Sequence, residues 1–216
     1  MNIIIPARLG SKGLPFKNRK LFKATIDSIP ESLRRRVFVT TDDPEIFQLA
    51  IKHGCCAIDR PSELSDDSAN IRDVMQHAVK NVGLSMSAEI IMLYLTYPER
   101  TWKEIYAAYE YYCQFADLGL ADSMLCKKEL KVSPYLMLQE HGADGSFGKP
   151  LLEHDLYRRQ DYPKCFEISH YVCIFRASAL YRLNKNMYGP STVFYPIEDV
   201  VDVDTQKDLD QVKWIR

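Results

Sequence analysis

A glycine-rich loop with three cationic side chains follows the first apolar run of the sequence. The segment at 6–18 reads PARLGSKGLPFKN and contributes Arg8, Gly10, Ser11, Lys12, Gly13, Lys17 and Asn18. Glycines let the backbone approach a ligand closely, and turned backbone N–H groups form a concavity suited to anions. The pattern is neither G-x-x-x-x-G-K-[ST] nor G-x-G-x-x-G, which disfavours P-loop proteins and dinucleotide-binding folds. We predict a triphosphate-binding loop, with a basic surface turn as the alternative.

Two aspartates near the end of the sequence have the spacing of a metal-binding pair. The run VVDVD at 200–204 is apolar apart from Asp202 and Asp204. On a strand, alternate side chains share a face, and two neighbouring carboxylates repel each other unless a cation lies between them. Oxygen ligands of this kind suit Mg²⁺. The alternative is coincidence, because D-x-D is common in a chain rich in aspartate.

A third segment, RPSELSDDS at 60–68, carries a cation at its start and a hydroxyl at its end. Arg60 is predicted either to bind a phosphate or nucleotide or to pair with Glu63 or Asp66. Ser68 stands where we expect the next helix to begin, and it is predicted to be either a plain N-cap or a ligand contact. On the residues alone both alternatives stay open.

The elements that must position these residues alternate between strands and helices. Apolar, β-branched runs predict strands at 2–6, 37–41, 90–95, 122–126 and 171–175. Helical periodicity and capping residues predict helices at 42–54, 68–83, 101–115 and 205–215. The alternation predicts an α/β fold with a mostly parallel sheet and helices on both faces. Ligands of such folds gather outside the carboxyl ends of the strands, where the 6–18 loop is expected.

The stretch at 127–170 breaks this rhythm with prolines, glycines, an Arg-Arg pair and mixed polarity. The length of 216 residues fits one domain. We predict a single domain over 1–216, in which this stretch forms an inserted lobe that contacts the substrate or a second subunit.

Charge balance and cysteine usage restrict the class of protein. The 28 Lys and Arg oppose 29 Asp and Glu, which gives no general attraction to nucleic acids or anionic membranes. The first apolar run is too short for a signal peptide, and no stretch could span a bilayer. Six scattered cysteines form no C-x-x-C pair, which favours reduced thiols over zinc ligands. We expect a soluble, cytoplasmic protein that binds neither nucleic acid nor membrane.

Several segments, in their order along the chain, resemble the acylneuraminate cytidylyltransferase family. They are IIPARLGSKGLPFKN at 4–18, VTTDDPEI at 39–46, RPSELSDDS at 60–68, TYPERT at 96–101, RRQDYP at 158–163 and VVDVDTQKDL at 200–209. The first segment is fairly specific, and the ordered set is more so. The related 3-deoxy-manno-octulosonate cytidylyltransferases share the architecture, but their first loop lacks the S-K-G-L-P-x-K-N pattern.

The resemblance implies a nucleotide-diphospho-sugar transferase-like fold, a homodimer and a set of site residues. The family's phosphate loop matches Arg8, Ser11, Lys17 and Asn18, beside Gly10. Its nucleotide-binding arginine and the residue that opens the following helix match Arg60 and Ser68. Its metal pair matches Asp202 and Asp204, and a further R-Q pair near the sugar matches Arg159 and Gln160.

The implied reaction transfers CMP from CTP to a small acidic sugar and releases pyrophosphate. The work is positioning and charge neutralisation, as in phosphoryl transfer generally. Asp202 and Asp204 would hold Mg²⁺ against the α-phosphate. Arg8 and Lys17 would offset the charge that grows on the leaving pyrophosphate. The resemblance therefore implies catalytic roles for Arg8, Lys17 and Asp202, and CTP and an acidic sugar as partners.

The chain departs from the family pattern at the sugar end. The family usually has L-Q-P-T-S-P-L-R where this chain has LYLTYPER, so that Tyr94 replaces a glutamine. The family often has R-x-N-G-A-I-Y where this chain has EISHYVC, so that Glu167, Ser169 and His170 replace arginine, asparagine and glycine. A cation suited to a sugar carboxylate has become an anion. An acidic sugar other than N-acetylneuraminate is therefore a live hypothesis.

Two other function classes compete with this interpretation. A D-x-D glycosyltransferase would use a nucleotide sugar and would not need the cradle for a triphosphate at 6–18. A non-catalytic nucleotide-binding relative would bind nucleotide without releasing pyrophosphate.

Overall fold

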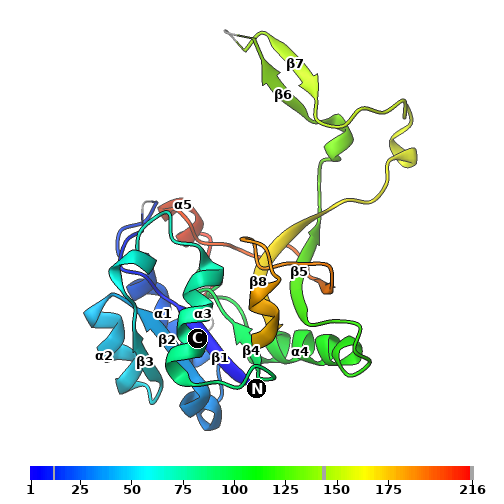
Figure 1. The fold of residues 1–216 in the computed structure, drawn as a ribbon. Helices are drawn as coiled ribbons and strands as arrows, with labels where there is room; N and C mark the ends of the chain where they lie inside the picture. Colours follow the sequence, from blue (N-terminus) through cyan, green and yellow to red (C-terminus); the bar gives the residue numbers. More distant parts are fainter. Residues whose placement is uncertain (12, 143–144, 215–216) are drawn as a thin grey trace.

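A seven-stranded mixed sheet forms the centre of the computed structural model, which describes residues 1–11, 13–142 and 145–214 (Figure 1). In spatial order its strands are β3 (Cys56–Asp59), β2 (Val37–Thr41), β1 (Asn2–Pro6), β4 (Glu89–Met92), β8 (Phe166–Arg176), β5 (Ser123–Glu129) and β9 (Thr192–Pro196). The strands β1 to β4 run parallel, β8 is antiparallel to both of its neighbours, and β9 is parallel to β5. The predicted, mostly parallel sheet is confirmed.

The central strands are apolar on both sides because helices cover both faces of the sheet. Along β1, Ile3 and Ile5 belong to one hydrophobic cluster and Ile4 belongs to the other. The first cluster includes apolar side chains of α1 (Lys17–Asp27), α2 (Pro44–Lys52) and α4 (Trp102–Ala116). The second includes those of α3 (Ile71–Val82) and of the 3₁₀ turn η5 (Ala177–Tyr181).

The remaining helical elements are short. They are α5 (Gln206–Leu209) and the 3₁₀ turns η1 (Glu31–Arg36), η2 (Ser62–Leu64), η3 (Pro134–Leu136) and η4 (Arg159–Asp161). None of the helices in the described part of the chain is long and apolar enough to cross a membrane.

Capping residues set the helix boundaries, and two expected boundaries are wrong. The capping box of Thr101 and Glu104 forms as expected. The helix expected from position 68 begins instead at Ile71, because Asn70 accepts a hydrogen bond from the Arg72 N–H and acts as its N-cap. The last helix, expected over 205–215, ends at Leu209. The chain then leaves the helical path, and Val212 is buried in the core.

The chain leaves the sheet between β5 and β8 as a long excursion (Figure 1). Its tip is an antiparallel pair, β6 (Leu138–His141) and β7 (Phe147–Pro150), which forms a separate two-stranded sheet. Every described residue of these two strands is exposed. An isolated two-stranded hairpin is marginally stable at best in water. The role predicted for a lobe over 127–170, and the single domain over 1–216, stay predictions.

Candidate active site

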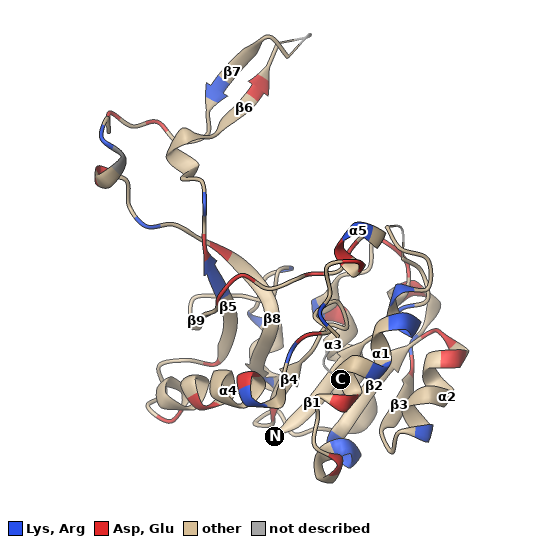
Figure 2. Cartoon of the chain, turned by 180° about the vertical axis from the view of Figure 1, so that it is seen from behind, with Lys and Arg blue, Asp and Glu red and all other residues tan. Residues whose placement is uncertain are grey.

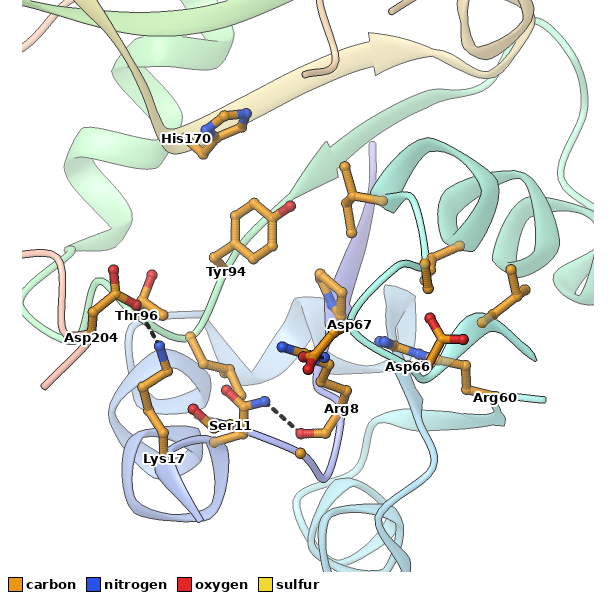
Figure 3. Close-up of a pocket in the computed structure, with 18 of the residues that line it drawn as sticks. Arg8, Ser11, Lys17, Arg60, Asp66, Asp67, Tyr94, Thr96, His170 and Asp204 are labelled. Carbon is orange, nitrogen blue, oxygen red and sulfur yellow. Dashed lines mark hydrogen bonds and ion pairs between the residues drawn. The ribbon is translucent and has the colours of Figure 1, made fainter. Parts of the chain in front are cut away.

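A pocket of about 400 Å³ lies where the strands β1 and β4 end (Figure 3). Figure 3 shows Lys17 and Asp204 at one end of it, Arg60 and Asp66 at the other, and Tyr94 between them. The pocket brings together eight of the nine residues that the family resemblance matches to nucleotide and metal binding: Arg8, Gly10, Ser11, Lys17, Asn18, Arg60, Asp202 and Asp204. This is the location at which open α/β sheets bind ligands.

The predicted phosphate loop turns sharply between β1 and α1 and is fixed from both sides. The Asn18 side chain, in the first turn of α1, donates a hydrogen bond to the Arg8 carbonyl oxygen at 2.8 Å. The Asp42 carboxylate, after β2, accepts a hydrogen bond from the Leu9 N–H at 2.8 Å. The Arg8 guanidinium lies 2.6 Å from the Asp67 carboxylate. Lys12 lies outside the described residues.

The segment with the two aspartates is not a strand, contrary to expectation, yet both side chains reach the pocket. Val203 between them is fully buried, and its N–H donates a hydrogen bond to the Thr96 carbonyl oxygen at 2.8 Å. This single bond is made beyond the end of β4, so no strand ladder forms. Burial of Val203 turns Asp202 and Asp204 away from the core, and both line the pocket. The sequence predicted this shared direction from the alternation of a strand, whereas burial of Val203 produces it.

Each aspartate side chain has a partner among the residues that the structure describes. The Lys17 ammonium lies 2.7 Å from the Asp204 Oδ1 atom (Figure 3). The Tyr97 hydroxyl donates a hydrogen bond to the Asp202 Oδ2 atom at 2.8 Å. No group of three or more His, Cys, Asp or Glu side chains with metal-binding geometry occurs among the described residues. Two carboxylates match a Mg²⁺ ion that completes its coordination shell with substrate phosphates and water.

Arg60 is almost fully buried and is only partly satisfied. Its Nη2 atom donates to the Thr40 carbonyl oxygen at 2.7 Å, while its Nε–H has no partner in the part of the chain that the structure describes. Neither Glu63 nor Asp66 forms an ion pair with it among those residues. Burial lowers the pKa of the guanidinium to about 10, so the side chain stays cationic at neutral pH. An unpaired buried donor is costly unless a ligand satisfies it.

Ser68, which the resemblance matches to nucleotide binding, does not line the pocket. Its hydroxyl and its N–H both donate to the Asp66 carboxylate, each at 2.8 Å. These two hydrogen bonds lower the pKa of Asp66, which does line the pocket. Ser68 therefore shapes the loop before α3, and its predicted contact with a ligand stays a prediction.

Of the residues that depart from the family pattern at the sugar end, the structure places some in the pocket and others outside it. Tyr94 and His170 line the pocket and meet edge to face, with ring centroids 5.8 Å apart. Glu167 does not line the pocket and lies 2.6 Å from the Lys128 ammonium instead. Figure 2 shows this acidic start of β8 beside the basic end of β5. Ser169 is buried, with its hydroxyl 3.5 Å from that of Tyr97.

An irregularity in β8 places His170 at the pocket. Met124 of β5 pairs with Ile174, but Cys126 pairs with Ser169, so β8 carries additional residues between these pairs. Bulges of this kind re-aim side chains, often next to active sites. The matched R-Q pair lies in η4 of the excursion, where Gln160 is exposed and the side chain of Arg159 falls outside the described part.

Among the pocket residues that sequence reasoning missed, three have ionisable side chains: Asp66, Asp67 and Tyr97. Asp67 is the partner of the Arg8 guanidinium, and the acidic run at 66–67 was the available signal. Tyr97 holds Asp202 from 105 positions away, and no local pattern announces such a pair.

Comparison with known proteins shows related sequences. Residues 2–132 match the family model described as Cytidylyltransferase. The chain is 30% identical to an N-acylneuraminate cytidylyltransferase of Streptococcus agalactiae, over 95% of this chain and 51% of that protein. It is 29% identical to the pseudaminic acid cytidylyltransferase of Campylobacter jejuni, over 97% of this chain and 93% of that protein. It thus spans about half the length of the streptococcal relatives.

Solved structures share the fold. A CMP:2-keto-3-deoxy-manno-octonic acid synthetase complexed with CTP matches with a TM-score of 0.64 and 14% identity, over 97% of this chain and 95% of that one. A cytidylyltransferase from Leptospira borgpetersenii matches with a TM-score of 0.59 and 15% identity, over 96% and 82% of the two chains. At these identities the likeness concerns the fold, and it confirms the expected nucleotide-diphospho-sugar transferase-like architecture.

Proposed function

Because this chain belongs to the cytidylyltransferase family, we propose that it transfers CMP from CTP to a hydroxyl group of a small acidic sugar and releases pyrophosphate. The observation that carries the proposal is one pocket that joins the cationic loop after β1 to two aspartates near the C-terminal end of the sequence. The acceptor oxygen forms a bond to the α-phosphorus, and the bond from that phosphorus to the pyrophosphate oxygen breaks.

Arg8 and Lys17 bind the triphosphate in this proposal. Without ligand, each cation pairs with a carboxylate of the pocket, Arg8 with Asp67 and Lys17 with Asp204. A triphosphate concentrates more negative charge than either carboxylate, so it competes for both cations. Once there, the two side chains offset the charge that develops on the leaving pyrophosphate. Gly10, Ser11 and Asn18 complete the lining of this end of the pocket.

Asp202 and Asp204 are the residues that would hold Mg²⁺. Their oxygens suit a hard divalent cation, and each has one carboxylate oxygen that takes no part in the contact with Tyr97 or Lys17 described above. When bound, Mg²⁺ would supply charge neutralisation at the phosphate oxygens. The backbone between the two aspartates is fixed by the hydrogen bond of the Val203 N–H, which keeps both side chains at the pocket.

Arg60 binds the nucleoside end of CTP. Its unpaired Nε–H and its low exposure provide a donor in a desolvated place, beside the apolar side chains of Ile71 and Val74. A buried donor that only the ligand satisfies favours ligands with an acceptor at that position.

The acceptor is an acidic sugar other than N-acetylneuraminate. The reason is the Tyr94–His170 contact in the pocket, where the family pattern has glutamine and glycine. Two rings leave less room than a glutamine and a glycine would, and they present a hydroxyl and an imidazole in place of an amide. The acids named for the relatives, such as pseudaminic acid, define the class to be assayed.

A homodimer formed through the excursion is part of the proposal. Leu138, Phe147 and Leu151 near its tip are 68%, 68% and 54% exposed. A second copy that covered these side chains would bury the apolar surface that the hairpin leaves in water.

A cytoplasmic location is also part of the proposal. The described cysteines are free, in keeping with this location.

The test is pyrophosphate release from CTP with Mg²⁺ and a panel of acidic sugars. We expect release with at least one acid of the panel and weak release with N-acetylneuraminate. Ordinary turnover of N-acetylneuraminate would contradict the proposed acceptor. Binding of a nucleotide sugar but not of CTP would favour a glycosyltransferase, and nucleotide binding without release across the panel would favour a non-catalytic protein.

A further inference from the structure

We propose that Tyr97 is a positioning residue for Asp202, which it holds in the orientation that a divalent cation requires. The inference rests on the proposed function, because it concerns the same metal site. It adds a residue outside the predicted set and a reason why one of the two aspartates has a fixed orientation.

The contact itself is specific. The Tyr97 hydroxyl donates to Asp202 Oδ2 at 2.8 Å, and Tyr97 is only 5% exposed whereas Asp202 is exposed. An exposed aspartate samples several rotamers, and a hydrogen bond from a buried donor selects one of them. Because the bond engages Oδ2, the Oδ1 atom is left for a cation.

The Tyr97 ring is fixed in turn by its neighbours. Tyr171 meets it edge to face, with ring centroids 5.4 Å apart. The Arg100 guanidinium lies 5.9 Å from the centroid of the Tyr97 ring and 5.7 Å from that of Tyr171. Arg100 is 1% exposed and donates hydrogen bonds to the carbonyl oxygens of Tyr94 and Tyr171. The donor that holds Asp202 is therefore part of the core rather than of the flexible surface.

Backbone contacts place the ring and the carboxylate in register. The Val203 N–H donates to the Thr96 carbonyl oxygen, and this hydrogen bond brings the residues beside Val203 close to those beside Thr96. Tyr97 follows Thr96, and Asp202 precedes Val203. The Tyr97–Asp202 hydrogen bond and the buried Val203 thus dock the aspartate segment on the loop after β4 at two points.

The Tyr97 hydroxyl thus acts on a carboxylate that would ligate the cation, and does not itself contact the metal position through the same oxygen. Groups that orient metal ligands in this way affect metal affinity by about 10- to 100-fold when they are removed.

The experiment compares Tyr97→Phe with Tyr112→Phe. Both substitutions remove one phenol hydroxyl from a buried ring, but the Tyr112 hydroxyl has no partner among the described residues. The probe is Mn²⁺, whose binding is measured by electron paramagnetic resonance in the presence of CTP. CTP affinity without metal and the thermal midpoint are measured beside it.

We expect Tyr97→Phe to weaken Mn²⁺ binding by about tenfold or more. CTP affinity without metal should stay unchanged, and Tyr112→Phe should match the unmodified protein. In an Asp202→Asn background, Tyr97→Phe should have no further effect on Mn²⁺ affinity. This coupling separates positioning from a general loss of stability.

Equal Mn²⁺ affinity in Tyr97→Phe and the unmodified protein would overturn this inference and leave the proposed function intact. A loss of Mn²⁺ affinity in Tyr112→Phe equal to that in Tyr97→Phe would overturn it as well. So would a loss from Tyr97→Phe in the Asp202→Asn background as large as the loss in the unmodified background. An unmodified protein that binds neither CTP nor Mn²⁺ would overturn both the inference and the proposed function.

Discussion

Gly13 of the phosphate loop packs directly on the carbonyl oxygen of Asp204, with no room for a side chain between them. A Cβ atom placed on Gly13 would lie 2.4 Å from that oxygen. The obstructing atoms belong to the Asp204 backbone, so no flexible side chain can move aside to relieve the clash. Two segments that are far apart in the sequence, one with cations and one with carboxylates, are thereby held in one pocket.

Gly13→Ala should separate these two segments. Relief of the clash requires a backbone shift, and overpacking of this kind costs about 1–3 kcal/mol. We expect a lower thermal midpoint of the ligand-free protein and a loss of at least tenfold in kcat/KM for CTP. Gly10→Ala is the matched control for stability, because nothing lies within 4 Å of its added Cβ. A Gly13→Ala protein with an unchanged midpoint and unchanged kcat/KM would contradict the close packing.

Arg60→Met should separate stability from binding. The substitution removes an unpaired buried N–H, and the Thr40 carbonyl oxygen keeps its other donor, the Ala7 N–H at 3.0 Å. We expect the ligand-free protein to unfold at an equal or higher temperature, while nucleotide affinity falls by about tenfold or more. Arg100→Met is the contrast, because Arg100 donates to two carbonyl oxygens in the core. Its midpoint should fall, and a fall of similar size in Arg60→Met would contradict this assignment.

Asp43 should make stability depend on pH in the acid range. Burial opposes ionisation of this carboxylate, but the hydrogen bond from Arg19 and the N-cap contact with Glu45 outweigh it, so its pKa is lowered. A lowered pKa gives stability that is present above the ordinary carboxylate range and is lost as the pH falls through the folded-state pKa. Asp43→Asn keeps an acceptor for the cap and loses the charge.

The corresponding measurement is the thermal midpoint of both proteins against pH. We expect Asp43→Asn to be less stable than the unmodified protein at pH 7 and the difference to shrink below pH 4. Asp43→Ala should lose a further ~1 kcal/mol at pH 7, because the cap is gone as well. A difference between Asp43→Asn and the unmodified protein that is constant from pH 7 to pH 3 would refute the role of the charge.

The acceptor preference should change with the two rings at the sugar end. Tyr94→Gln combined with His170→Gly restores the family pattern in the pocket. We expect kcat/KM for N-acetylneuraminate to rise by about tenfold or more relative to that of the preferred acid. Glu167→Arg alone should leave this ratio unchanged, because Glu167 does not line the pocket. A ratio that responds to Glu167→Arg and not to the double variant would reverse the assignment.

Local patterns predicted most of the central fold. The apolar run of β1 and the apolar face of α3, with Val74, Met75 and Ala78 buried, follow from periodicity. The strands that were missed lack a buried run: β3 has one buried residue, β9 has none, and all residues of β6 and β7 are exposed. These strands form by pairing, β3 with β2, β9 with β5 and β6 with β7, and a single sequence does not show the partners.

The site was predictable where one segment carries the chemistry and not where two segments share it. The loop at 6–18 carries its cations and glycines in one continuous segment of the sequence. The orientation of Asp202 depends on Tyr97, and the end of the last helix depends on burial of Val212. Ser68 is separated from the helix by Asn70, a competing N-cap two residues on. Tertiary contacts decided the orientation of Asp202 and the end of the last helix, over local propensity, whereas the start of α3 was decided by a local choice between capping residues.

The most direct test of the account is thermal unfolding with CTP, UTP, ATP and GTP, each with and without Mg²⁺. A ligand that binds only the folded protein raises the midpoint by mass action, and the assay needs no knowledge of the sugar. We predict a shift that is largest for CTP with Mg²⁺, lost in Lys17→Met and retained in Lys20→Met, whose lysine lies on the same helix outside the pocket. No shift with any triphosphate would contradict the assignment of the loop and the two aspartates to CTP.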